Sequence, residues 1–402
     1  MIERSQATRR EWTRLAAGVF VLAIGCSSEA VAPDGDGAGD ASADAGGPTA
    51  VVFGDRVARR QFPALQAGAT GVTAPIAFAL PAETLSVTVV TEAADGRLAV
   101  ARWRDGGGQN LVDEHWLSGP LAPWLCTQGC VFRQQSRPFE QALLAPNAPR
   151  PATLAGVHEL RALHQAHDQG KWLPASGQVR VELVAVRGPA LAAGRLPVNL
   201  CLTGALGWNA KNAPVLPRLQ QAIADATQIL AQVGIQLSVA VHDVAGAAPL
   251  VEHSSEDNEL RDLFATGAQL PLGVNVFLVE QVYVATGGVQ SPIAGISGGI
   301  PGPPLRMGTA GAGIAVSLAL GPGEDDRLGL AIAHELGHFL GLYHTSEAQI
   351  GADPALHDDL GDTPGDGEDN LMYWAPQAGA TKLSAEQGQI LRSSAWLQPI
   401  GQ

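Results

Sequence analysis

Hydrophobic and polar positions alternate in the first half of the chain. Residues 85–89 and 179–185 place apolar side chains at every second position, which is the period of a strand with one buried face. Glycine and proline bound these runs. We therefore predict that residues 51–189 form an all-β, sandwich-like domain. The pattern leaves open whether this domain is an accessory binding domain, a pro-domain or a spacer.

The pattern changes near residue 190. Apolar positions recur at helical spacing over residues 214–233, and Ser384 is a suitable N-cap for a helix near the C-terminus. Strands are predicted at residues 196–202, 235–244 and 313–320, and the near-continuous apolar run at residues 274–282 predicts a buried strand. Another apolar stretch with helical spacing follows the last of these strands. The order strand–helix–strand–strand–strand–helix fits an α/β (α+β) domain over residues 190–402. The chain is thus predicted to be multidomain.

The first residues have the pattern of an export signal. Arginines precede an apolar run, residues 15–24, that is too short to span a membrane, so residues 1–25 are predicted to be a signal peptide. Cys26 ends a segment that resembles a bacterial lipobox and is the predicted lipidation site. Residues 26–50 are small and acidic, as in a flexible linker. We expect an exported protein, either lipid-anchored in the cell envelope or extracellular.

Composition narrows the class of partner. The chain has 402 residues, of which 46% are hydrophobic and 16% charged, enough for two domains with apolar cores. Its net charge of −14 argues against a nucleic-acid partner.

Residues 334–344 have the pattern H-E-x-x-H-x-x-G-x-x-H and contain the candidate metal-binding and catalytic side chains. On a helix, His334 and His338 lie one turn apart on the same face and can converge on one Zn²⁺. His344 can join them only if the helix stops and the chain reverses. Gly341 stands where that reversal is needed, because glycine tolerates positive φ. We predict that the three histidines bind zinc.

Three protein ligands leave one zinc position open, as in catalytic sites. Glu335, next to a ligand, is the predicted general base for a water molecule at that position. The expected reaction is hydrolysis of a peptide bond. The other interpretation is a chance match inside a buried helix, but three histidines and a glutamate are costly to bury unpaired.

A methionine follows the histidine pattern, in Asn370-Leu371-Met372-Tyr373-Trp374. The two motifs together resemble the metzincin zinc metalloproteases, and Asp362-Thr363-Pro364 makes the pappalysin-like group the most similar. The resemblance covers roughly the last half of the chain. It implies that Met372 forms a structural turn beneath the metal. Many metzincins have tyrosine where this chain has Trp374, so assistance by Tyr373 to the zinc or the oxyanion is left open.

Two further segments each have two interpretations. The acidic loop is either a solvated surface loop or a calcium site, which pappalysin-like relatives make plausible. The candidate calcium ligands are Asp358, Asp359, Asp362 and Asp366. The Gly/Pro-rich residues 292–304 are either an ordinary loop or the upper rim of a cleft, where a strand edge pairs with extended substrate.

The remaining cysteines and histidines have simpler expected roles. Cys126 and Cys130 are close enough to form a disulfide, and the alternative is that one of them occupies the zinc as a latency cysteine. Cys201 is expected to be a buried thiol. The remaining prediction concerns three histidines expected on the surface of a short helix, namely His158, His164 and His167.

Together these patterns predict a secreted or lipid-anchored zinc metallopeptidase, a hydrolase of the metzincin type that acts on peptide or protein substrates. Zn²⁺ is the expected cofactor, with Ca²⁺ as a second candidate. The alternative is a surface-anchored binding or adhesion protein in which the β-rich half works and the zinc domain is latent or degenerate.

Overall fold

The computed structural model describes residues 49–52, 55–118, 125–126, 130–148, 154–168, 171–248, 250–254, 257–286, 289–319, 327–346, 358–363, 367–375 and 379–400. The predicted signal peptide, Cys26 and nearly all of the predicted linker lie outside these residues. Among the described residues, no helix is both long enough and apolar enough to cross a bilayer.

The first half of the chain forms ten hydrogen-bonded strands in the order β1-β4-β10-β5-β12-β2, with β11, β3, β6 and β9 paired beside this path. Their bounds are β1 (Thr49–Ala50), β2 (Val57–Gln61), β3 (Leu65–Ala67), β4 (Ile76–Leu80), β5 (Thr84–Arg104), β6 (Asn110–Val112), β9 (Arg137–Ala145), β10 (Gly156–Asp168), β11 (Lys171–Pro174) and β12 (Gly177–Arg187). A short helix, η2 (Glu114–Ser118), and a small pair, β7 (Leu125–Cys126) with β8 (Gln134–Gln135), complete this half.

Strand β5 is the long central strand of this first sheet and pairs with four other strands. Its first part pairs with β12 and β9, whereas its last part pairs with β10 and β6. The alternation seen in the sequence becomes a buried face, since Val87, Val89, Val179 and Leu183 are all fully buried. The predicted β-rich character of this half is therefore present. All ten strands belong to one hydrogen-bonded sheet, so the sandwich arrangement remains a prediction.

The second sheet has the order β14-β13-β16-β20-β19, with β21 beside β13. The strands are β13 (Gly194–Leu202), β14 (Ile235–Asp243), β16 (Val274–Val279), β19 (Gly295–Ser297), β20 (Ile314–Ser317) and β21 (Gln398–Pro399). Strands β14, β13, β16 and β20 are parallel, and β19 runs antiparallel at the edge. The remaining elements are η3 (Ala205–Gly207), η4 (Ala213–Val215), α2 (Pro217–Ala231), β15 (Leu250–His253), α3 (Asn258–Ala265), β17 (Gln281–Thr286), β18 (Val289–Ile293), α4 (Leu328–Phe339) and α5 (Ala385–Arg392).

Both faces of the second sheet are covered. Helices α2 and α4 share one apolar core with Val276 and Leu278 of β16, whereas α3 and the small sheet β15-β17-β18 pack with Phe277 and Val279 on the other face. A strand buried on both faces has no polar positions to alternate. This explains why β16 is a continuous apolar run in the sequence.

Two sequence predictions differ from the structure in this half. The single strand predicted at residues 274–282 is divided at residue 280 into β16 and β17, which belong to different sheets. Elements β15, α3 and β18 were not predicted. The predicted helix at residues 214–233 is present as α2, preceded by η4, and Ser384 caps α5 by accepting from the Gln387 amide.

The prediction for three histidines was wrong in part. His158, His164 and His167 lie on strand β10, and the first two are buried. His158 accepts a hydrogen bond from Trp103 Nε1 at 3.3 Å and donates to the Leu154 carbonyl at 2.9 Å. An imidazole with both nitrogens bonded can be buried in a strand core, and only His167 is exposed.

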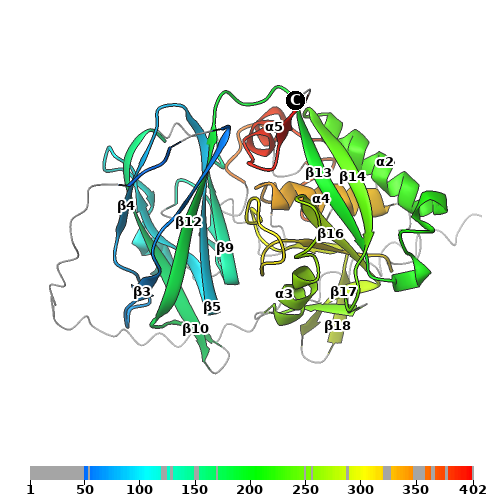
Figure 1. Cartoon of the computed structure of the whole chain (residues 1–402), viewed down its shortest axis with the longest axis horizontal. Helices are drawn as coiled ribbons and strands as arrows, with labels where there is room; N and C mark the ends of the chain where they lie inside the picture. Colours follow the sequence, from blue (N-terminus) through cyan, green and yellow to red (C-terminus); the bar gives the residue numbers. More distant parts are fainter. Residues whose placement is uncertain are drawn as a thin grey trace, which may run out of the picture.

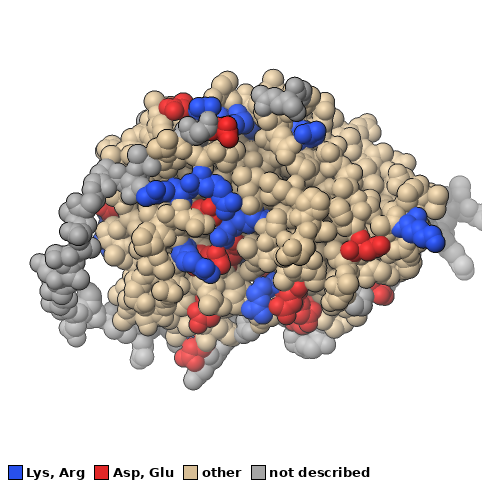
Figure 2. All heavy atoms as spheres, viewed as in Figure 1, with Lys and Arg blue, Asp and Glu red and all other residues tan. Residues whose placement is uncertain are grey.

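The two sheets are packed against each other, with α5 at the upper end of their boundary (Figure 1). Leu144 of β9 belongs to the apolar core of the second sheet, and Val184 and Val186 of β12 pack on Ala395. Arg306 binds three carboxylates of the first sheet, Glu92 at 2.8 Å, Glu182 at 3.3 Å, and Glu140. Figure 2 shows basic and acidic side chains gathered along this boundary.

The structure joins Cys126 and Cys130 by a disulfide, with Cα atoms 6.2 Å apart. Neither thiol is therefore free to occupy a metal site, which argues against the latency alternative. Cys201 is a buried free thiol, as expected, and burial raises its pKa to about 12.

Candidate metal centre

Helix α4 carries the first two histidines of the motif. All twelve of its residues are buried, because the helix packs against α2 and against strands β19 and β20 of the second sheet. His334 and His338 are one turn apart, and their ring centroids are 4.7 Å from each other.

The chain reverses where the sequence predicts it. The α4 helix ends at Phe339. Gly341 has a φ of 115°, a backbone conformation that residues with a Cβ rarely adopt. The amides of Gly341 and Leu342 donate to the carbonyls of His338 and Gly337, both at 2.9 Å. This turn brings His344 back toward the helix. Its Nε2 lies 3.3 Å from His334 Nε2 and 3.0 Å from His338 Nε2.

Backbone carbonyls determine which ring nitrogen faces the centre. His334 Nδ1 lies 2.6 Å from the Leu371 carbonyl, and His338 Nδ1 lies 2.7 Å from the Leu342 carbonyl. A carbonyl oxygen only accepts, so each Nδ1 carries a proton and donates it. Each Nε2 then carries a lone pair and lies within 3.3 Å of His344 Nε2. Histidine ligands of metals are oriented by this kind of hydrogen bond.

These three nitrogens fit a zinc ion. His344 Nε2 lies 3.0–3.3 Å from the Nε2 atoms of His334 and His338. Ligands at about 2.0–2.1 Å from a tetrahedral zinc lie roughly 3.3–3.4 Å apart, close to the observed separations. Among the described residues, these histidines are the only three metal-binding side chains whose ligand atoms lie within 4.8 Å of one another.

Burial keeps the imidazoles in the form that binds metals. Loss of solvent and the neighbouring His344 lower the pKa of His334 to about 3, and the same causes hold the pKa of His338 well below its usual value. Both rings are therefore neutral at physiological pH.

Glu335 points from α4 toward the edge strand β19. Its carboxylate accepts a hydrogen bond from the Ser297 amide, while burial raises its pKa to about 8. A cation between the histidines would oppose that increase. Gly295 allows this approach, because a Cβ at that position would lie 2.7 Å from Glu335 Cγ. The sequence did not identify Ser297 or Gly295 as site residues.

Met372 is fully buried and packs against helix α4 at Gly337. A Cβ on Gly337 of α4 would lie only 2.5 Å from its Sδ, so the two residues are in close contact. The Asn370 side chain accepts from the Met372 amide at 2.8 Å, and the Met372 carbonyl accepts from Thr345 at 2.9 Å. This turn also provides the Leu371 carbonyl that orients His334.

The remaining predicted site residues are Tyr373 and the aspartates of the acidic loop, and their predicted roles stay predictions. Tyr373 is partly exposed, and its ring centroid lies 6.2 Å from that of Trp374. Within the described segment 358–363, Asp358, Asp359 and Asp362 do not form a three-ligand cluster, and Asp366 lies outside the described residues. Asp358 accepts from the Thr363 hydroxyl, and burial raises its pKa to about 7.

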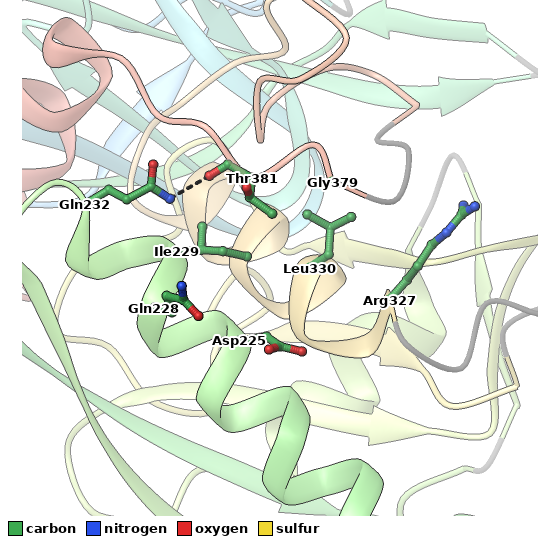
Figure 3. Close-up of a pocket in the computed structure, with 8 residues that line it drawn as sticks. All are labelled: Asp225, Gln228, Ile229, Gln232, Arg327, Leu330, Gly379 and Thr381. Carbon is green, nitrogen blue, oxygen red and sulfur yellow. Dashed lines mark hydrogen bonds between the residues drawn. The ribbon is translucent and has the colours of Figure 1, made fainter.

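A cavity of about 210 Å³ lies between α2, α4 and the segment at Gly379–Thr381 (Figure 3). Residues from these three parts of the chain line it, and Gln232 Nε2 donates to the Thr381 carbonyl at 2.8 Å. Its lining includes neither Glu335 nor any of the three histidines. We assign it no part in the chemistry.

No protein-family model and no curated protein sequence matches the chain. Metalloproteinase-II from Bacteroides fragilis aligns with 55% of this chain at 14% identity and a TM-score of 0.32, and the match spans 63% of its length, less than two thirds. Archaemetzincin from Methanopyrus kandleri aligns with 50% of this chain and 87% of its own, at 15% identity and a TM-score of 0.27. A chaperone–substrate complex aligns with 60% of this chain and 38% of its own, at 14% identity and a TM-score of 0.28. With TM-scores below 0.5, these similarities carry no argument about this chain.

Proposed function

We propose that the protein is a zinc-dependent endopeptidase of the metzincin type. The convergence of three imidazole Nε2 atoms beside Glu335 is the observation that carries this proposal. His334, His338 and His344 are the proposed ligands. Zinc bound there supplies Lewis-acid chemistry, polarising a peptide carbonyl and acidifying a water molecule.

The chain's own residues perform the proton transfers. Glu335 takes a proton from the attacking water as the water oxygen bonds to the peptide carbonyl carbon. It then returns a proton to the amine nitrogen as the carbon–nitrogen bond breaks. Met372 and Leu371 hold the turn that orients His334.

Strand β19 is the proposed place for the substrate backbone. It is the edge of the second sheet and lies against Glu335. An extended peptide can add to a strand edge through main-chain hydrogen bonds. The half-buried residues Gly295 and Ile296 are the part of β19 proposed for this pairing, because Ser297 is buried. This supports the interpretation of residues 292–304 as the upper rim of a cleft.

Several finer statements belong to the same proposal. We propose residues 190–402 as the catalytic domain, residues 51–189 as a β-rich domain, and similarity to the pappalysin-like group on the residues of the motif alone. Export, the lipid anchor at Cys26, calcium binding in the acidic loop and assistance by Tyr373 rest only on the sequence patterns given above. No specific observation favours the alternative of an adhesion protein.

The test uses the full chain and a fluorogenic peptide library, with zinc removed by a chelator and then restored. We expect cleavage only in the zinc-loaded protein. Glu335→Ala should retain one zinc per chain but lose cleavage, whereas His344→Ala should lose zinc. Cleavage by Glu335→Ala at the wild-type rate, or unchanged zinc affinity in His344→Ala, would contradict the proposed roles.

A further inference from the structure

A buried ion pair crosses the boundary between the two sheets beside β19. Arg137 of β9 lies 3.2 Å from Asp257, and both side chains are only 9% exposed. Asp257 also bonds to His253 Nδ1 at 2.6 Å. We call these three residues, Arg137, Asp257 and His253, the Arg137 cluster. Arg97 of β5 also lies close enough to interact with its charges.

The Arg137 guanidinium reaches the end of strand β19. Its Nε donates to the Gly298 carbonyl at 3.2 Å, and its Nη2 lies 3.5 Å from the Ser297 carbonyl. Glu335 packs against the same strand, since a Cβ on Gly295 would lie 2.7 Å from Glu335 Cγ, and the Ser297 amide is the backbone donor to its carboxylate. Arg137 therefore contacts the same residue of β19 as Glu335 does, from the opposite sheet.

Segment 297–299 depends on hydrogen bonds for its shape. Its residues are Ser297, Gly298 and Gly299, and glycine loses more conformational freedom on ordering than any other residue. The Gly298 amide donates to the Gly313 carbonyl at 2.9 Å, and Ser297 Oγ donates to the Gly299 carbonyl at 2.7 Å. Arg137 adds a rigid, planar donor with a fixed fork.

Backbone strain is concentrated around the cluster. Four non-glycine residues in the described part of the chain have positive φ, and three of them lie at this boundary: Phe139, Asp257 and Leu305. Such conformations persist only where the surroundings determine them. Asp257 has φ of 48°, and its amide is held by Ser254 Oγ at 3.2 Å. The strained backbone directs the Asp257 carboxylate at Arg137.

We propose that Arg137 is a positioning residue for Glu335. By fixing the Ser297–Gly298 end of β19, it holds the Ser297 amide in the position from which that amide donates to Glu335. The Glu335 carboxylate is thereby kept in place for proton transfer. This inference rests on the proposed peptidase function. On this proposal the first sheet contributes to the working site, and it is neither a removable pro-region nor a spacer.

The test compares full-length variants that differ in one interface contact. Arg137→Lys keeps a positive charge beside Asp257 but loses the fork that reaches two carbonyls. Ser86→Ala is the matched control, because Ser86 Oγ donates across the same boundary to the Ser393 carbonyl at 2.6 Å, a contact that involves neither β19 nor Glu335. Zinc content, kcat and KM for a fluorogenic peptide, and hydrogen–deuterium exchange of residues 293–300 are measured for each.

For Arg137→Lys we expect full zinc content, a fall in kcat of about tenfold or more with KM nearly unchanged, and faster exchange at residues 293–300. Ser86→Ala should show none of these changes. Unchanged exchange, or a kcat equal to that of Ser86→Ala, would overturn the inference. If the wild-type protein cleaves no peptide, the proposed function fails by itself. The exchange data would still decide whether Arg137 holds β19.

Discussion

Replacing Gly295 by alanine should disable Glu335 without touching the zinc ligands. The added Cβ would lie 2.7 Å from Glu335 Cγ and 3.1 Å from its Oε1. Carbon atoms pack at about 3.5–4.0 Å, so the Glu335 side chain must move by about 1 Å. The backbone of Gly295 does not have positive φ, so alanine adds no backbone strain. A misplacement of about 1 Å can cost on the order of 10²-fold in rate, which corresponds to about 2.7 kcal/mol of activation free energy.

The assay measures kcat, KM and zinc affinity for Gly295→Ala beside Gly68→Ala. Gly68 is a matched control, because a Cβ there would meet no atom within 4 Å and its φ is not positive. We expect kcat to fall on the order of 10²-fold in Gly295→Ala, with zinc affinity unchanged, and no effect in Gly68→Ala. A kcat within about threefold of wild type would refute the stated position of Glu335 against β19.

Three further predictions concern stability. Gly337→Ala should lower the free energy of unfolding of the zinc-loaded protein by about 1–3 kcal/mol in denaturant titrations, because the new Cβ would lie 2.5 Å from Met372 Sδ. A higher free energy of unfolding, as expected for alanine in an unobstructed helix, would contradict this contact. Arg306→Ala should lower the free energy of unfolding by about 3–5 kcal/mol, because it leaves the buried Glu140 carboxylate without its cation. Arg59→Ala removes a half-exposed partner of Glu182 and should lower it by less than about 1 kcal/mol. Equal losses in the two variants would contradict this prediction. In the folded protein the pKa of Asp358 is raised to about 7, so between its unfolded pKa near 4 and pH 7 the folded state binds more protons than the unfolded state. The free energy of unfolding therefore falls as the pH rises, by up to about 1.4 kcal/mol per pH unit. Asp358→Asn should remove this slope in unfolding measured without added calcium, and an unchanged slope would show that Asp358 is not its source.

The metal centre was predictable because its parts are close in sequence. The three histidines, Glu335 and the turn at Gly341 lie within eleven residues. Helical geometry and the tolerance of glycine for positive φ are enough to bring the imidazoles together. The strand at 196–202 was predictable because burial of a parallel sheet on both faces produces an apolar run. The strand at 235–244 was predictable from alternation instead, since β14 is an edge strand in which Gln236, Ser238 and Ala240 are exposed.

Contacts between distant segments were not predictable in the same way. Arg137 and Gly298 are 161 positions apart, and nothing near either residue indicates the other. His158 was assigned to the surface because its partner Trp103 lies 55 positions away on another strand. The division of residues 274–282 at residue 280 also depends on tertiary structure, since β17 pairs with β15 and β18 rather than with the second sheet.

The central claim is that three imidazoles hold one zinc ion and leave one position open. X-ray absorption at the zinc edge of the zinc-loaded full chain tests it directly. We predict one zinc per chain with three imidazole nitrogens and one further light atom at about 2.0–2.1 Å, and loss of one imidazole in His344→Ala. A zinc with sulfur ligands, or a spectrum unaltered by His344→Ala, would contradict the account.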